Sequence, residues 1–186
     1  MRQALGLFCC LSIALTAGAS SAGTLRDENV LTPVPAGFKV GYHTVQGPMV
    51  LAEYVPQAET VNAWSSMITV QIFHGQGGRD PDAFAQTIAS GWQGACANST
   101  VTRVVGGAEN GYPFAVWAFE CPLNRETGKP ENMWLKAVGG ADALYSVQYA
   151  DRAPMSPALI KPAMSYLRQV KVCDTRRKDR ACPAGM

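Results

Sequence analysis

Short runs of alternating apolar and polar residues fill the middle of the chain and predict β-strands. The run at 67–73 is rich in β-branched residues, which favour an extended backbone. Turns containing glycine or proline separate most of these runs, which indicates antiparallel pairing between neighbouring strands. The predicted strands lie at 38–44, 49–54, 67–73, 100–105, 112–119, 133–138 and 144–149, with 170–172 as a short last strand.

Two segments carry helical periodicity. Asp80 is expected to cap the first helix, which ends at Gly91 or Gly94, and Phe84, Ile88 and Trp92 form its apolar stripe. The second helix opens at Ser156 and Pro157, and Pro162 implies a late start or a kink. Thr60 is expected to cap a single helical turn that runs to Trp64, and the polar segments 24–29 and 122–132 are interpreted as loops.

The cysteines predict two disulfides. The segment 106–111 is interpreted as a turn centred near Ala108 and Glu109, with 100–105 and 112–119 as its paired flanks. Cys96 and Cys121 lie equally far from that centre, so we expect them to face each other and bond. Cys173 and Cys182 close a short polar loop that cannot bury itself, and we expect a local disulfide there.

The first 22 residues have the layout of a secretory signal peptide. One positive charge at Arg2 precedes an apolar region at 5–15 and a run of small residues that offers cleavage after Ala22 or, alternatively, after Ala19. The apolar region is shorter than the roughly 20 residues of a membrane-spanning helix, so no stable membrane insertion is expected after cleavage. We therefore predict a signal peptide at 1–22 and a periplasmic or secreted protein at 23–186.

Composition narrows the class of protein. Hydrophobic residues make up 47% of the chain and charged residues 16%, a balance typical of one compact domain. A net charge of +2 argues against a nucleic-acid partner, and the basic loop predicted at 171–186 has an excess of only three positive charges. The predicted fold is a single α+β domain, with a central antiparallel sheet flanked by helices and stapled by disulfides.

Two kinds of residue are candidates for ligand binding. The glycine-rich segment 74–80 precedes a helix and could present N–H groups to an anion, with His74 and Arg79 as supporting charges. The alternative is a plain strand-to-helix turn, which Asp80 favours because its carboxylate would cap the helix. Trp64 and Trp134 lie beside predicted loops and could line a groove for sugar or peptide.

Metal, cofactor and catalytic chemistry are not predicted. The histidines, His43 and His74, are far in sequence from the cysteines, and no motif for a cofactor or for a nucleophile and its base is present. The favoured function is therefore a non-enzymatic accessory or binding protein. The alternatives are a small secreted hydrolase, with His74 as its first candidate base, and a structural or envelope-associated interaction protein.

Three stretches carry a resemblance to a known family: Pro35-Ala36-Gly37-Phe38, the run 54–71, and the run 166–174. They resemble uncharacterised exported proteins of proteobacteria, which are similar to the PsbP-like superfamily that includes the DcrB-type periplasmic proteins. The resemblance covers most of 34–174. It implies a PsbP-like central antiparallel sheet and an accessory or binding role, with an unknown protein or envelope component as partner, and it implies no catalytic residues.

Overall fold

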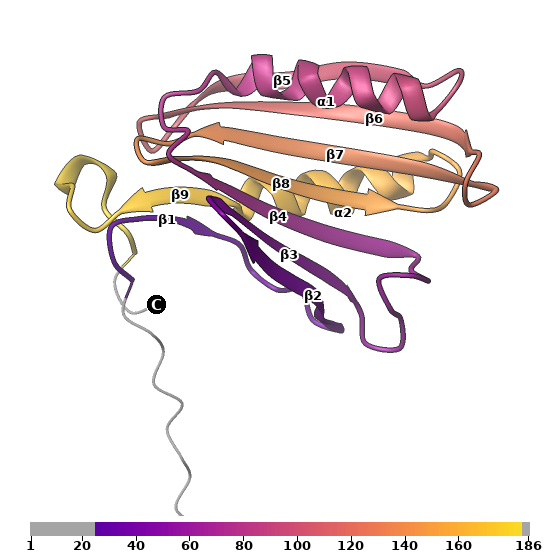
Figure 1. Cartoon of the computed structure of the whole chain (residues 1–186), viewed down its shortest axis with the longest axis horizontal. Helices are drawn as coiled ribbons and strands as arrows, with labels where there is room; N and C mark the ends of the chain where they lie inside the picture. The colour runs from indigo at the N-terminus through magenta and orange to yellow at the C-terminus, as the bar shows by residue number, and fades with distance from the viewer. Residues whose placement is uncertain (1–24, 184–186) are drawn as a thin grey trace, which may run out of the picture.

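The computed structural model describes residues 25–183 and centres on one seven-stranded antiparallel sheet (Figure 1). Its strand order is β2-β3-β4-β8-β7-β6-β5, and a separate two-stranded sheet joins β1 to β9. The strands are β1 (Glu28–Leu31), β2 (Phe38–Gln46), β3 (Met49–Pro56), β4 (Ser66–His74), β5 (Thr100–Glu109), β6 (Tyr112–Asn124), β7 (Lys129–Gly139), β8 (Ala143–Asp151) and β9 (Lys171–Asp174).

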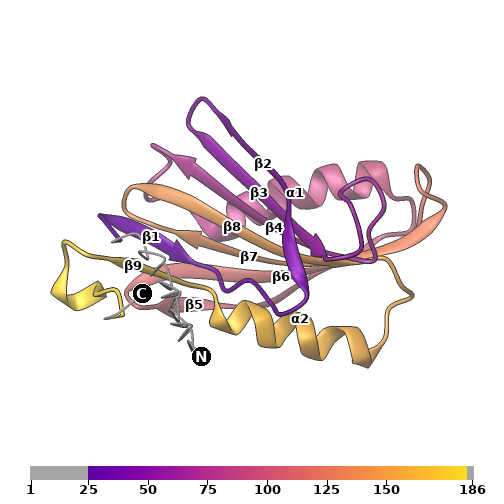
Figure 2. The same ribbon diagram turned by 90° about the horizontal axis from the view of Figure 1, so that it is seen from below.

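Two helices cover opposite faces of the large sheet, as Figure 2 shows in a view from below. Side chains alternate between the two faces of a strand, so each strand in the middle of the sheet serves both cores. On β7, Met133 and Leu135 pack with α1 (Pro81–Ala95), whereas Trp134 packs with α2 (Pro157–Gln169). The fold is therefore α+β with an antiparallel sheet flanked by helices, as predicted.

The first helix begins where the sequence predicts. One carboxylate oxygen of Asp80 accepts hydrogen bonds from the backbone N–H groups of Asp82 and Ala83, at 2.7 and 3.0 Å, which satisfies free donors of the first turn. The helix continues past both predicted end points to Ala95. On its buried side, the Trp92 ring lies edge-on to Phe119 of β6, with 5.6 Å between centroids.

The hairpin between β5 and β6 turns at Asn110 and Gly111, two residues later than predicted. Both residues have positive φ, 49° and 74°, and Glu109 pairs directly with Tyr112. A bulge between Arg103 and Val105 shifts the register further along the hairpin. The hairpin centre from which Cys96 and Cys121 were predicted to face each other was therefore placed two residues too early.

The disulfides nevertheless join the two predicted pairs, Cys96 to Cys121 and Cys173 to Cys182. Cys96 is the C-terminal cap of α1 rather than a strand residue, and it meets Cys121 because the end of α1 lies over β6. Their Cα atoms are 5.8 Å apart, an ordinary spacing for a disulfide. The first disulfide thus staples a helix to the sheet.

Two segments that were predicted to be irregular contain strands. Residues 28–31, of which 28 and 29 were expected in a polar lead, form β1 and pair antiparallel with β9, close to the short last strand predicted at 170–172. The basic segment beyond β9 includes the 3₁₀ turn η1 (Lys178–Arg180). The expected loop at 122–132 is mostly strand, because β6 and β7 extend to within four residues of each other. The first difference arises from pairing with a distant strand, which a local pattern does not contain, whereas the second arises because the hairpin of the neighbouring strands β6 and β7 is longer than predicted.

Residues 60–64 form a tight turn instead of the predicted helical turn. Thr60 and Ala63 exchange backbone hydrogen bonds at 3.2 and 3.0 Å, which makes an isolated β-bridge. The turn places Trp64 two residues before β4, with its side chain packed with Val55 and Met67. The predicted signal peptide, 1–22, lies outside the described residues. Among residues 25–183, no helix combines the length and the apolar character needed to span a membrane.

Candidate functional site

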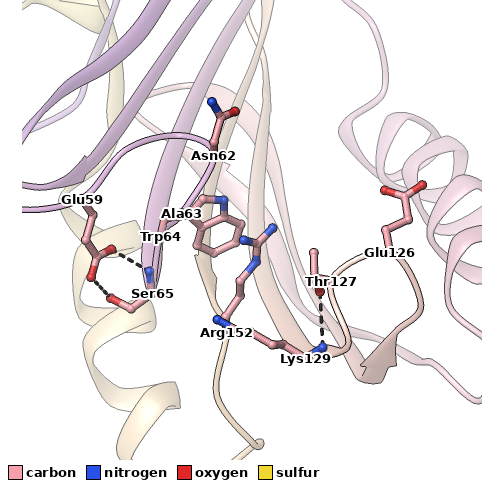
Figure 3. A pocket seen from close by; sticks show the side chains of 9 residues that line it. All are labelled: Glu59, Asn62, Ala63, Trp64, Ser65, Glu126, Thr127, Lys129 and Arg152. Carbon is pink, nitrogen blue, oxygen red and sulfur yellow. Dashed lines mark hydrogen bonds between the residues drawn. The ribbon is translucent and has the colours of Figure 1, made fainter.

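A surface cavity of about 580 Å³ opens at one end of the large sheet, where three connections meet (Figure 3). They are the β3–β4 loop, the β6–β7 hairpin and the segment that follows β8. Direct pairing of β4 with β8 brings the β3–β4 loop next to the segment that follows β8, and the N–H of Arg152 donates to the carbonyl of Ser65 at 2.8 Å. The cavity is lined by Glu59, Asn62, Ala63, Trp64, Ser65, Glu126, Thr127, Lys129 and Arg152.

The centre of the cavity is a stack of Arg152 on Trp64. The guanidinium carbon lies 3.8 Å from the indole centroid, and Nε donates to a carboxylate oxygen of Glu131 at 3.3 Å. Only 16% of the Arg152 side chain is exposed. A cation over an indole face is attracted by the ring's quadrupole, so the stack fixes the guanidinium in one orientation. We call this cavity the Trp64–Arg152 cavity.

The β3–β4 loop is held in shape by Glu59. Its two carboxylate oxygens accept from the Ser65 N–H at 2.6 Å and from the Ser65 hydroxyl at 2.7 Å. Both oxygens of this carboxylate are therefore engaged inside the loop. The result is a preformed wall on which Trp64 is already positioned.

The β6–β7 hairpin forms the opposite wall and is linked to the same stack. Gly128, with φ of 66°, closes the turn by donating to the carbonyl of Asn124 at 2.8 Å. The side-chain amide of Asn124 donates to Glu131 at 3.3 Å, on the oxygen that also receives Arg152. Glu131 therefore couples the position of the hairpin to that of the guanidinium.

A second carboxyl group lies at the base of the same loops. Asp151, the last residue of β8, accepts a hydrogen bond from the Ser66 hydroxyl at 2.8 Å. Burial raises the pKa of Asp151 above its ordinary value, and the bond from Ser66 opposes that rise. The loop end thus combines a fixed cation with a carboxyl group whose pKa lies above its ordinary value.

His74 lies elsewhere, at the far end of β4, and lines a different cavity of about 420 Å³ together with Glu28, Asp142 and Tyr145. Glu28 is engaged there: its carboxylate accepts from the N–H groups of Ala141 and Asp142 and from the Tyr145 hydroxyl. Burial and the nearby Glu28 charge raise the pKa of Tyr145. This carboxylate ties β1 to the turn between β7 and β8.

The glycine-rich segment 74–80 is packed as a strand-to-helix turn. The N–H groups of Gly75 and Gly78 donate to the carbonyls of Asp142 and Gly140, at 3.0 and 2.8 Å. The Arg79 guanidinium lies over the Phe84 ring, 5.4 Å from its centroid. Since internal partners already occupy these N–H groups and Asp80 caps α1, the geometry favours the alternative to an anion site.

Trp134 lies in the core beneath α2, and only 2% of the residue is exposed. It became a candidate because a loop was expected before it, whereas that segment is strand. Of the four residues proposed for ligand binding, only Trp64 lines the Trp64–Arg152 cavity. Arg152 was missed, because no local signal links it to Trp64. Within the described part of the chain, no three His, Cys, Asp or Glu side chains group closely enough to hold a metal ion.

Comparisons with known proteins yield structural similarity alone. No protein-family model matches the chain, and no curated protein sequence matches it. Among solved structures, a mutant of protein Mog1 aligns with a TM-score of 0.45 and 13% identity, over 74% of this chain and 78% of that one. LpqN, involved in cell envelope biogenesis of Mycobacterium tuberculosis, aligns with a TM-score of 0.40 and 11% identity, over 82% and 86%. At these values the similarities identify neither a family nor a function.

Proposed function

We propose that this chain is an exported, non-enzymatic binding protein whose ligand, a protein or another component of the cell envelope, docks at the Trp64–Arg152 cavity. One observation carries the proposal. The Arg152 side chain is mostly buried, yet among the described residues only the Nε of its guanidinium donates a hydrogen bond, to Glu131. A fixed, partly buried cation with unpaired donors beside an open cavity is a feature that a ligand can complete.

Export is supported by the covalent framework. Two disulfides are typical of proteins that work in an oxidising compartment, and the first 22 residues have the pattern of a signal peptide. The resemblance to DcrB-type periplasmic proteins points the same way. Intact-mass measurement of the protein from its native host should give a chain beginning at Gly23, and a full-length, membrane-extracted species would refute this part of the proposal.

A binding role is supported by the rigidity of the cavity walls. Glu59 holds one loop and Glu131 connects the other to Arg152, so little ordering is needed when a ligand arrives. A preformed site retains more of its interaction energy as affinity, because fewer side chains lose freedom on binding.

The test is a pull-down from envelope extract with the mature, oxidised protein as bait. We expect a stoichiometric partner that Arg152→Met loses and Arg125→Met retains. Arg125 belongs to the same hairpin but does not line the cavity, so its substitution removes the same charge without altering the site. Retention of the partner by Arg152→Met would refute the cavity as its binding surface.

A secreted hydrolase is the second candidate, because one cavity brings His74 together with Asp142 and Tyr145. A histidine beside carboxyl and phenol groups could serve as a general base. A panel of hydrolase substrates decides between the two functions. Turnover that His74→Ala abolishes would defeat the binding proposal, whereas a stoichiometric partner without turnover favours it.

A further inference from the structure

The orientation of Arg152 determines which of its donors face the cavity. A guanidinium group donates in its own plane, from Nε and from both Nη atoms. Stacking on Trp64 uses the face of that plane, and Glu131 takes only Nε. The Nη groups have no hydrogen-bond partner among the described residues, and they are not sealed from solvent. A forked pair of donors is therefore presented to the cavity.

A second cation, Lys129, lines the same cavity. No carboxylate of the described residues lies within salt-bridge distance of its Nζ. Figure 3 shows the Lys129 side chain extending from the hairpin toward Arg152. Lys129 is the first residue of β7 and Arg152 follows β8, so the two positive side chains come from different connections and line the same cavity.

The carboxylates that line the cavity do not neutralise this pair. Both oxygens of Glu59 are bound to Ser65 within the β3–β4 loop. Glu126 lies on the far side of the hairpin, and its carboxylate points away from Arg152 (Figure 3). Neither Glu59 nor Glu126 therefore forms an ion pair with Arg152 or Lys129, and Glu131 engages only the Nε side of the guanidinium.

We propose that Arg152 and Lys129 bind a carboxylate group of the ligand, an inference that rests on the Trp64–Arg152 cavity being the binding site proposed above. The two Nη atoms of Arg152 match the two oxygens of a planar carboxylate, and Lys129 adds a point charge. A singly charged group suits the site better than a phosphate dianion, because the Glu131 carboxylate already offsets part of the positive charge of the guanidinium. The C-terminus of a peptide and a uronic acid are the two carriers of this chemistry to be distinguished.

The test is an NMR titration of the oxidised, processed protein with matched acids and neutral analogues. N-acetyl-Ala-Ala is compared with its C-terminal amide, and glucuronic acid with its methyl ester. We expect one of the acids to shift the Trp64 indole N–H and the Arg152 Nε–H signals saturably, and its neutral analogue to bind at least about tenfold more weakly. The acid that binds more tightly identifies the carrier.

Two variants of Arg152 separate the fork from the charge. Arg152→Lys keeps the charge but loses the forked donors, so we expect it to weaken binding of the acid about tenfold, and Arg152→Met to weaken it further. Arg125→Met is the matched control and should stay within about twofold of the unmodified protein, because an exposed charge outside the cavity contributes little. Thermal unfolding of each variant verifies that it is folded.

Equal binding of acid and neutral analogue, no shift at Trp64 and Arg152 with either acid, or full affinity in Arg152→Lys would overturn the inference. The proposed function fails differently. An envelope partner that Arg152→Lys retains but Arg152→Met loses leaves the binding function standing and removes the carboxylate. Conversely, selective binding of an acid with no partner in envelope extract upholds the carboxylate site and refutes an envelope ligand.

Discussion

Replacing Lys136 by methionine tests how α2 is held on the sheet. Lys136 projects from the middle of β7, and only 4% of its side chain is exposed. Its ammonium donates to Glu109 at 2.6 Å and to two carbonyls at the end of α2, those of Val170 at 2.7 Å and Leu167 at 3.3 Å. One buried cation therefore joins the β5–β6 hairpin, the central sheet and the C-terminal end of the helix, where the helix dipole favours positive charge.

The cost of the substitution follows from what each partner loses. Methionine keeps most of the aliphatic stem, so little packing is lost, and it has no ammonium to desolvate. Glu109 is one-third exposed and can be hydrated again, whereas the carbonyl of Val170 loses a short bond in a buried place. Hydrogen bonds to charged groups contribute about 1.5–3 kcal/mol each, so after the partial recovery we expect a loss of about 2–3 kcal/mol.

Chemical denaturation of the oxidised protein measures this loss, and thermal unfolding should show Tm lowered by about 4–12 °C. Lys171→Met is the matched control, because Lys171 lies 3.9 Å from the same Glu109 carboxylate but is mostly exposed. We expect the control to cost less than about 1 kcal/mol, as is usual for exposed ion pairs. Equal losses in the two variants, or no loss in Lys136→Met, would refute the reasoning.

Three further predictions concern stability. Cys121→Ser should lower the free energy of unfolding by about 3.5 kcal/mol, the chain-entropy value for a loop of this length, measured by denaturation against the oxidised protein. Hydrogen bonding to Arg103 lowers the pKa of Asp82. The Asp82 carboxylate therefore stabilises the fold above its unfolded pKa, and this contribution is lost as the pH falls through its folded pKa. Acid titration should destabilise the unmodified protein more steeply than Asp82→Asn. Gly77→Ala should destabilise the folded protein, because the new Cβ would lie 1.9 Å from a carbonyl oxygen of the β7–β8 turn. Gly91 occupies an open position of α1, so Gly91→Ala should stabilise the protein by about 0.5–1 kcal/mol in the same thermal unfolding series.

The strands and helices of the large sheet could be predicted because their signals are local. Alternation places β4 and β8 to within one or two residues, and Asp80 followed by Pro81 defines the start of α1. The turn of the β5–β6 hairpin was locally encoded too. Asn110-Gly111 is the dipeptide that best tolerates two positive φ values, and a turn centred two residues earlier overlooks that preference.

Other features depend on distant partners and leave no local trace. Residues 28–31 contain little strand pattern, and they become β1 through pairing with β9 and through the Glu28 carboxylate on the β7–β8 turn. The two central residues of the candidate site differ in the same respect: one has a local sequence signal and the other does not. Trp64 was identifiable as an aromatic residue beside a loop, whereas Arg152 reaches it only because β4 pairs with β8.

Site-specific photo-crosslinking in the intact envelope tests most directly whether the Trp64–Arg152 cavity binds a ligand. A photoreactive amino acid is placed at Asn62, an exposed residue that lines the cavity, and in a second protein at Gln86, an exposed residue of α1 outside it. We predict one discrete adduct from position 62, lost on adding Arg152→Met, and none from position 86. Adducts of equal yield from both positions, or none from position 62, would contradict the proposed binding site.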